Sequence, residues 1–200
     1  MDKKEQWESE CQPFELDFQS NDNYRWDATG FHAAWTTHFE QWCGMCSYHY
    51  PDRVMLDLGC GSRPAIDFFQ SSVRYYLDPL LAEFTKIPQV EDVWDLYHIN
   101  HALNVPAEKY VHMLHKSCMF INCWNCLDHC YDWEQVIANV IGYARAGCML
   151  AIATDTVPHK GHIGIDDPAK LYKMLSKEFI VVKEENGYWG RDYAWLMQKK

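Results

Sequence analysis

The sequence lacks the features that would place the protein in a membrane, on nucleic acid or among repeat proteins. No apolar stretch approaches the roughly 18 residues needed to cross a bilayer, and the polar N-terminus does not resemble a secretion signal. No run of Lys or Arg is present and the formal net charge is −10, whereas binding nucleic-acid phosphates needs a basic face. Internal repeats and low-complexity segments are missing too. We therefore expect a soluble, cytoplasmic protein that binds neither nucleic acid nor a membrane, and the sequence leaves its oligomeric state open.

Cysteine is present in an odd number, nine, without a secretion signal, so we expect reduced thiols rather than a disulfide framework, and no bound metal. A structural zinc site is the alternative. Its ligands would come from two Cys-x-x-Cys pairs and from two residues that follow the second pair: Cys43–Cys46, Cys123–Cys126, His129 and Cys130. The long interval between the two pairs disfavours this zinc site. The 200 residues, 48% of them hydrophobic, suffice for one domain with a full core.

An apolar segment that runs into a Gly-x-Gly turn is the most informative motif in the chain. Residues 54–58 (Val-Met-Leu-Asp-Leu) predict a buried strand, and a tight turn follows at residues 59–61. Because Gly59 and Gly61 have no side chains, a ligand can lie directly against the backbone there. Pro64 begins a short predicted helix, whose free N–H groups face the same place. This arrangement predicts a site for a nucleotide-like cofactor.

The same segment resembles the first motif of the class I S-adenosylmethionine-dependent methyltransferases. That family's pattern is an acid, any residue and Gly-x-Gly-x-Gly after a buried strand, and residues 57–63 read Asp-Leu-Gly-Cys-Gly-Ser-Arg, with Arg63 in place of the third glycine. The resemblance implies that S-adenosylmethionine is the cofactor. The residues that it places along the methionine end of that cofactor are Asp57, Gly59, Cys60, Gly61 and Arg63. A dinucleotide needs a further glycine where Pro64 stands, which disfavours NAD.

Residues 73–77 predict a second strand that ends at Asp78 and Pro79. The interval from Gly61 to Asp78 is close to the roughly 20 residues expected between a glycine turn and an acid that binds ribose hydroxyls. Asp78 is therefore a candidate ribose ligand with Pro79 beside it, although an Asp-Pro pair also starts ordinary turns.

A third strand is predicted over residues 94–99, and residues 100–106 resemble the family's third motif. In that motif a polar residue meets the adenine amino group. The resemblance makes Asn100 and Ala102 the candidates for this contact.

A further buried strand is predicted over residues 118–122, and its loop resembles that of many small-molecule methyltransferases of this class. They carry an Asn, then Leu-acid-His and an Asp before a helix, and the matching residues here are Asn125, Leu127, Asp128, His129 and Asp132. Asn122 and Trp124 are candidate cofactor contacts, Asn122 from its place at a strand end and Trp124 by stacking, with plain packing as the alternative for Trp124. Asp132 and Gln135 predict a capping box for a helix that ends at Gly147.

Strands that alternate with helices imply a parallel sheet with helices on both faces. Residues 179–183 and 193–197 predict two more strands, which pair most simply as an antiparallel hairpin. The predicted fold is α/β: a doubly wound, mostly parallel seven-stranded sheet with a C-terminal antiparallel hairpin, the Rossmann-like methyltransferase fold. Within one compact unit, residues 51–200 form the S-adenosylmethionine-binding domain. Residues 1–50 form an N-terminal arm or irregular cover (residues 1–24) and a helical lid (residues 27–43).

The resemblance implies transfer of a methyl group from S-adenosylmethionine to an O, N or S atom of a small-molecule acceptor by in-line displacement. The candidate catalytic residues are His129 and His162, because an imidazole can take a proton near neutral pH; His159 lies in the same loop as His162. A non-catalytic S-adenosylmethionine-binding regulator or partner subunit is the alternative, as is cofactor consumption without transfer to an acceptor. No Asn/Asp-Pro-Pro-aromatic motif follows residue 121, which disfavours methylation of DNA amino groups.

Overall fold

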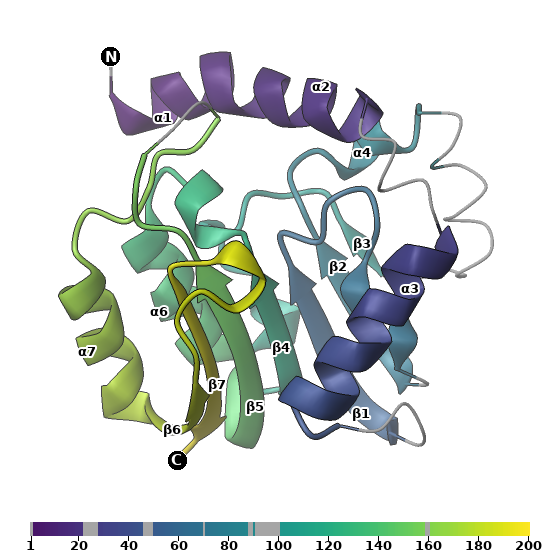
Figure 1. Cartoon of the computed structure of the whole chain (residues 1–200), viewed down its shortest axis with the longest axis vertical. Coiled ribbons are helices and arrows are strands. Elements are labelled where there is room, and N and C mark those ends of the chain that lie inside the picture. Colours follow the sequence, from purple (N-terminus) through teal and green to yellow (C-terminus); the bar gives the residue numbers. More distant parts are fainter. Residues whose placement is uncertain are drawn as a thin grey trace.

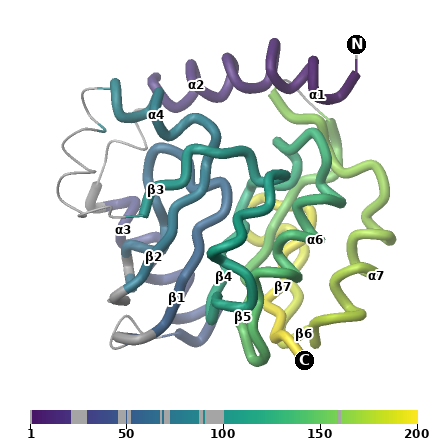
Figure 2. The backbone as a smooth tube through the Cα atoms, turned by 180° about the vertical axis from the view of Figure 1, so that it is seen from behind, coloured from purple at the N-terminus to yellow at the C-terminus, as the bar shows by residue number. Residues whose placement is uncertain are grey.

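The sheet of this protein has seven strands in the order β3-β2-β1-β4-β5-β7-β6 (Figures 1 and 2). The structure is a computed structural model that describes residues 2–21, 28–45, 50–69, 71–87, 90, 101–158 and 161–200. The strands are β1 (Tyr50–Leu58), β2 (Ser71–Leu77), β3 (Ala102–Leu103), β4 (Cys118–Trp124), β5 (Ala144–Thr154), β6 (Phe179–Glu184) and β7 (Tyr193–Lys199). The strands β1 to β5 are parallel to one another, whereas β7 is antiparallel to both β5 and β6. The predicted sheet with a C-terminal hairpin is confirmed.

Both faces of the sheet are covered, which explains why its central strands are continuous apolar runs. Successive residues of a strand point to opposite faces, so Leu56 and Met55 of β1 belong to two different cores. Leu56 packs in the core that includes α6 (Trp133–Tyr143) and α7 (Pro168–Glu178). Met55 packs in the core of the other face. The segments on that face are α3 (Ala28–Thr37), a π-helical segment (His38–Trp42) and α4 (Leu81–Phe84), with α3 in front of the sheet in Figure 1.

Two helices begin at an Asp cap, and the one at Asp132 is predicted from the sequence. The Asp132 side chain accepts a hydrogen bond from the backbone N–H of Gln135 at 3.0 Å, and the Asp167 side chain accepts one from Lys170 at 2.8 Å. Each such cap contributes about 1 kcal/mol of stability. The predicted end of α6 at Gly147 is wrong: α6 ends at Tyr143, and Gly147 lies inside β5, where its φ of 76° bends the strand.

The irregular conformation considered for the N-terminal residues is wrong, because residues 3–21 are helical. They comprise α1 (Lys3–Gln6), a π-helical segment (Trp7–Cys11) and α2 (Gln12–Asn21), which follow one another across the top of the sheet in Figure 1. A capping box starts this helix: Asp2 accepts from the N–H of Glu5 at 2.8 Å, and the Asp2 N–H donates to the Glu5 carboxylate at 3.1 Å. The pattern Asp-x-x-Glu was therefore a usable signal.

Other predicted elements differ in extent. Pro64 is extended and precedes a 3-10 helix (Ala65–Phe68) rather than an α-helix. The predicted strand over residues 94–99 lies outside the described residues, and the third strand of the sheet is the short β3. In the part of the chain that the structure describes, no helix combines the length and the apolar composition that crossing a membrane requires.

Candidate functional site

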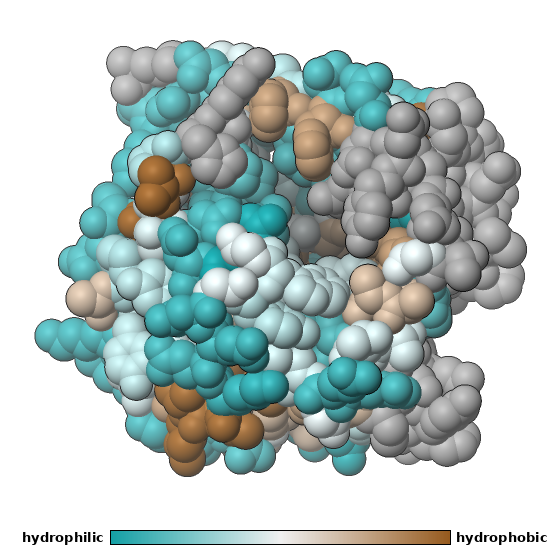
Figure 3. All heavy atoms as spheres, viewed as in Figure 1, coloured by the Kyte–Doolittle hydropathy of each residue, from teal (hydrophilic) through white to brown (hydrophobic). Residues whose placement is uncertain are grey.

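A cavity of about 300 Å³ lies at the carboxyl ends of β1, β2 and β4, where parallel sheets bind their ligands. Its lining comes from the turn after β1, from residues 7–19 of the N-terminal helix, from α3, and from the turn between β6 and β7. Figure 3 shows a hollow below the N-terminal helix on this face of the molecule. The cavity therefore combines the predicted cofactor turn with segments that are distant in sequence.

The glycine turn has a backbone that other residues do not adopt readily. Gly59 and Gly61 have φ values of 68° and 62°, in the left-handed region. A Cβ atom on Gly59 would lie 2.5 Å from the Sγ of Cys126 and 2.7 Å from its Cβ, which is closer than real contacts allow. The Gly59 N–H donates to the Leu77 carbonyl at 2.7 Å, and this hydrogen bond holds the turn against the end of β2. The absence of a side chain at Gly59 therefore allows both the left-handed backbone of the turn and its close packing against Cys126.

Asp57 holds the turn and the neighbouring strand together. One carboxylate oxygen accepts from the N–H groups of Ala65 and Ile66 at 2.6 and 3.2 Å, and the other accepts from the Asn122 amide at 2.8 Å. The side chain lines the cavity, yet Asp57 is only 2% exposed, and burial raises its pKa to about 6 against the opposing effect of these hydrogen bonds. Asp57 fixes the shape of the site through three protein donors.

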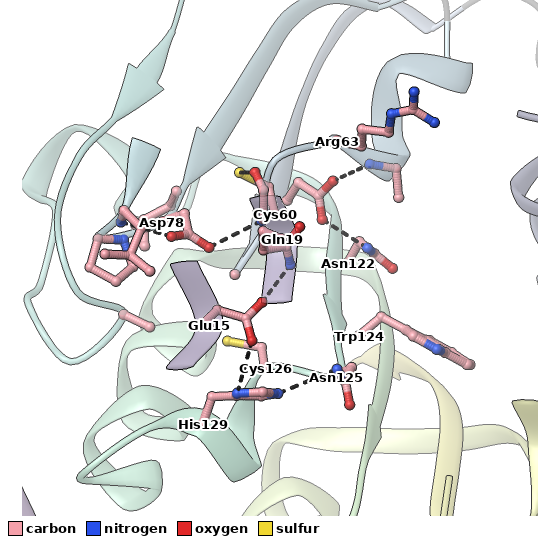
Figure 4. Close-up of a pocket in the computed structure, with 18 of the residues that line it drawn as sticks. Glu15, Gln19, Cys60, Arg63, Asp78, Asn122, Trp124, Asn125, Cys126 and His129 are labelled. Atoms are coloured by element: carbon pink, nitrogen blue, oxygen red, sulfur yellow. Dashed lines mark hydrogen bonds and ion pairs between the residues drawn. The ribbon is translucent and has the colours of Figure 1, made fainter. Parts of the chain in front are cut away.

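Asp78 joins the ends of β1 and β2 at the cavity wall. Its carboxylate accepts from the N–H of Gly61 at 3.1 Å and from the N–H of Leu80 at 2.8 Å (Figure 4). Burial raises the pKa of Asp78 to about 7. Asp78 and Pro79 both line the cavity, as the sequence predicts for a ribose subsite.

Two amide oxygens in the cavity lining have no hydrogen-bond partner among the described residues: Oδ1 of Asn122 and Oδ1 of Asn125. A buried acceptor without a donor is destabilising by about 1–3 kcal/mol. Both atoms are therefore suited to a ligand that brings N–H or O–H donors. Asn125 also has a positive φ of 55°, a conformation that Asn tolerates better than most residues.

The remaining candidate residues divide into those that line the cavity and those that do not. Cys60, Arg63 and Trp124 line it. Arg63 is buried, its guanidinium lies 5.5 Å from the centre of the Phe31 ring, and Figure 4 shows it on the opposite side of the turn from Asp78. Ala102 is exposed in β3 and is not part of the lining. Asn100 and His159 lie outside the described residues.

The N-terminal helix covers the cavity through polar contacts with both loops beneath it. Ser62 of the glycine turn donates to the Gln19 side-chain oxygen at 2.7 Å, and the Gln19 amide donates to the Glu15 carboxylate. The other Glu15 oxygen lies 3.8 Å from Nδ1 of His129, in the loop after β4 (Figure 4). The helix therefore behaves as a lid whose polar side chains link the cofactor turn to the candidate catalytic histidine.

Aromatic rings form another wall of the cavity. Trp35 of α3 packs edge to face against Trp124 and Trp189, with ring centres 6.2 and 5.2 Å apart. Trp189 has a φ of 52°, which costs a bulky residue about 1–3 kcal/mol, and its side chain is 42% exposed. Arg191, which follows in the same turn, lines the cavity and forms an ion pair with Asp155. An unfavourable backbone conformation at a cavity wall is typical of a residue held there for function.

Of the two predicted catalytic histidines, only His129 lines the cavity. His162 packs behind it, with the two ring centres 3.8 Å apart, and its Nδ1 contacts the carboxylate of Asp128. The structure therefore brings both predicted histidines together with an acid that the sequence placed in the loop but not in the site.

Sequence reasoning missed several residues of the lining. They are Trp7, Glu15, Gln19, Glu108, Trp189 and Arg191. Glu108 accepts from the N–H groups of Tyr131 and Asp132 at 2.8 and 3.3 Å, and burial raises its pKa to about 7. No motif of the sequence pointed to these residues, apart from the N-terminal capping box that would have placed Glu15 on a helix.

The described cysteines are free and buried: Cys11, Cys43, Cys60, Cys118, Cys123, Cys126, Cys130 and Cys148. Cys46 lies outside the described residues. Within the described ranges, the group of His, Cys, Asp and Glu side chains spaced to hold a metal ion consists of Asp128, His129 and His162, and it includes no cysteine.

Comparison with known proteins identifies the fold. No protein-family model matches this sequence, and no curated protein matches it. Among solved structures, phosphoethanolamine N-methyltransferase 1 of Haemonchus contortus has a TM-score of 0.68 at 11% identity, over 100% of this chain and 50% of that chain. N-methyltransferase NodS of Bradyrhizobium japonicum WM9 has a TM-score of 0.61 at 10% identity, over 92% and 96%. Both were crystallised with S-adenosylhomocysteine.

The [4+2]-cyclase SpnF is also similar, with a TM-score of 0.56 at 13% identity over 75% of both chains. At these identities the likeness establishes the fold, which is that of the class I S-adenosylmethionine-dependent methyltransferases. Since a protein named as a cyclase is among the neighbours, the fold alone does not fix the reaction, and the function has to be argued from the cavity.

Proposed function

We propose that this protein is an S-adenosylmethionine-dependent methyltransferase that acts on an O, N or S atom of a small-molecule acceptor. One observation carries the proposal: the glycine turn, the buried carboxylate of Asp78 and the unpartnered oxygen of Asn122 line a single cavity at the carboxyl edge of a methyltransferase-fold sheet. Two structural neighbours were crystallised with S-adenosylhomocysteine, the demethylated form of that cofactor.

The residues present fit this cofactor. A carboxylate offers about four lone-pair sites, so Asp78 can accept ribose hydroxyls in addition to its two backbone N–H donors. The free Oδ1 of Asn122 suits the ammonium group of the methionine end, with Asp57 holding the Asn122 amide in place. Gly59 and Gly61, with Cys60 between them, let the cofactor lie against the backbone. Pro79 would flank the ribose, and Arg63 and Trp124 would border the methionine end.

When bound, S-adenosylmethionine supplies the activated methyl group, and the protein supplies orientation and exclusion of water. The acceptor atom has to lie about 3 Å from the methyl carbon and in line with the bond that breaks, a proximity effect. The lid helix and the wall of Trp35, Trp124 and Trp189 enclose the space for this alignment. Because the cofactor would take up part of the covered cavity, the space left suits a compact acceptor, and the net charge of −10 disfavours nucleic acid.

His129 and His162 are proposed to activate the acceptor. A hydroxyl or a protonated amine has to lose a proton before it attacks the methyl group, whereas a thiolate does not. His129 lines the cavity, and the rings of His129 and His162 are in contact. His129 is therefore the member of the pair that would meet the acceptor.

Calorimetric titration with S-adenosylhomocysteine tests the cofactor site. We expect the wild-type protein to bind it, and Asp78→Ala to weaken binding by about tenfold or more, the loss of about 1.4 kcal/mol. Glu83→Ala is the matched control, because Glu83 is a half-exposed carboxylate on α4 that pairs with Lys86 and does not line the cavity. Equal affinity in the wild type and in Asp78→Ala would remove the assigned ribose site.

Turnover separates the enzyme from a binding protein of the same fold. The purified protein is incubated with methyl-labelled S-adenosylmethionine and a low-molecular-weight cell extract. We expect the labelled methyl group to be transferred to a small molecule of the extract. Tight binding with no transfer to any extract fraction would support the alternative of a regulator or partner subunit. Release of S-adenosylhomocysteine without a labelled acceptor would indicate cofactor consumption instead.

A further inference from the structure

The loops after β4 and β5 bring together three side chains that can ligate a metal ion. Asp128 and His129 lie on the 3-10 helix Leu127–His129, and His162 comes from the loop after β5. One ligand atom from each lies within 4.8 Å of the others. Since β4 and β5 are neighbours in the sheet, this juxtaposition follows from the fold rather than from a loose surface contact.

Asp128 is the centre of this group and is held rigidly. It is fully buried, one carboxylate oxygen accepts from the Thr154 hydroxyl at 3.2 Å, and the other contacts Nδ1 of His162. Its backbone carbonyl accepts from the N–H groups of Ile163 and Gly164 at 2.8 and 3.0 Å, which ties the loop of His162 to the loop of His129. The group is thus organised before any ligand arrives.

The two ring nitrogens of His129 face different groups. Its Nε2 lies 3.9 Å from the same Asp128 oxygen that contacts His162 and 3.3 Å from the Asn125 amide nitrogen, which an ion would displace, while its Nδ1 lies 3.8 Å from the Glu15 carboxylate of the N-terminal helix. Histidines that bind a metal through one ring nitrogen usually direct the other at a carboxylate or carbonyl, which fixes the tautomer. Glu15 occupies that outer position here.

We propose that Asp128, His129 and His162 bind a divalent transition-metal ion of the zinc class. Two imidazoles and one carboxylate suit zinc and its first-row neighbours, whereas magnesium and calcium prefer oxygen ligands. Ligand atoms around one ion at about 2.0–2.2 Å lie roughly 3–4 Å from one another, a spacing that this group reaches with small adjustments. The ion would lie between the Asp128 carboxylate and Nδ1 of His162, in place of the direct contact between these two groups.

Such an ion would lie at the edge of the acceptor space, because His129 lines the cavity. Three protein ligands leave a coordination position open, and an acceptor hydroxyl or amine bound there would lose its proton more readily. This consequence rests on the proposed function, whereas the metal site itself does not.

The test is a metal titration of the full chain after chelation and complete reduction of its thiols. Cobalt(II) is the first probe, because its absorption spectrum distinguishes nitrogen and oxygen ligands from thiolates, and zinc(II) by calorimetry is the second. We expect one ion per chain, bound by nitrogen and oxygen. Asp128→Asn and His162→Gln should each raise the dissociation constant by about tenfold or more, and Glu15→Gln by a smaller factor.

His112→Gln is the matched control, since His112 is exposed and lies far from the group, at the other end of β4. His162→Gln leaves the buried Asp128 in place, so it keeps the test valid if Asp128→Asn fails to fold. Titration of S-adenosylhomocysteine into the same preparations reports the cofactor site separately. The inference is overturned by the absence of saturable binding, by unchanged affinity in both ligand variants, or by a thiolate spectrum that Cys126→Ser abolishes.

Discussion

The Gly59→Ala substitution gives a direct measure of how tightly the glycine turn is built. Alanine would have to adopt a φ of 68°, and its Cβ would lie 2.5 Å from Sγ and 2.7 Å from Cβ of Cys126. Cys126 is buried and is the N-cap of the 3-10 helix after β4, so it has little room to move away. The substitution therefore combines a backbone cost with a steric one.

The two costs can be estimated separately. The left-handed conformation costs an alanine about 1–2 kcal/mol, and overpacking of a filled site costs about 1–3 kcal/mol. The sum, about 2–5 kcal/mol, is a large part of the total stability of a domain, about 5–15 kcal/mol. Gly187→Ala isolates the first cost, because Gly187 has a φ of 78° and nothing within 4 Å of the added Cβ.

Urea unfolding measures the loss of unfolding free energy in both variants. We expect the loss to be about 1–3 kcal/mol larger in Gly59→Ala than in Gly187→Ala. Adding Cys126→Gly to Gly59→Ala should recover most of that excess, since it removes both close atoms, while Cys126→Ala should recover only the part due to Sγ. If Gly59→Ala costs no more than Gly187→Ala, or if no change at Cys126 restores stability, the packing of the turn described here is wrong.

Two further predictions concern the pH dependence of stability and the lid. Because burial raises the pKa of Asp78 to about 7, the folded chain keeps a proton that the unfolded chain loses near pH 4, so the stability of the cofactor-free protein should fall as the pH rises from about 4 to about 7. Asp78→Asn should make that slope shallower in urea unfolding, while Asp57 and Glu108, whose pKa values burial also raises, supply the rest of it. An unchanged slope would exclude Asp78 as a source. Gln19→Ala removes the acceptor of the Ser62 hydroxyl, and hydrogen exchange in residues 3–21 should then accelerate while β4 stays protected. Glu10→Ala, exposed on the same helix, should leave exchange unchanged, and equal effects of the two substitutions would argue against the lid contact.

Those parts of the fold that could be predicted are the ones encoded by neighbouring residues. The alternation of strands and helices, the Asp132 cap of α6, and the final hairpin follow from local patterns, and each is present. The helix over residues 3–21 was missed because its sequence is polar. In the π-helical segment and α2 only Trp7, Cys11 and Gln19 are buried, so no apolar stripe marks the helix, and its stability comes from contacts with distant loops.

The candidate site divides in the same way. Asp57, Gly59 and Gly61 lie close together in the sequence, and the motif that contains them predicts the turn found at the cavity. Glu15 and Trp189 reach the cavity from opposite ends of the chain, and only tertiary packing places them there. The contact between Gly59 and Cys126 joins segments 67 residues apart (126 minus 59), so no local sequence pattern predicts it.

The most direct test of the central claim is a crystal structure of the protein with S-adenosylhomocysteine. We expect the nucleoside in the cavity over Gly59 and Gly61, with its ribose hydroxyls within hydrogen-bond distance of the Asp78 carboxylate and the amino group of the methionine end near Oδ1 of Asn122. Density for the ligand elsewhere, or a cavity that stays closed to it at saturating concentration, would show that this cavity is not the cofactor site.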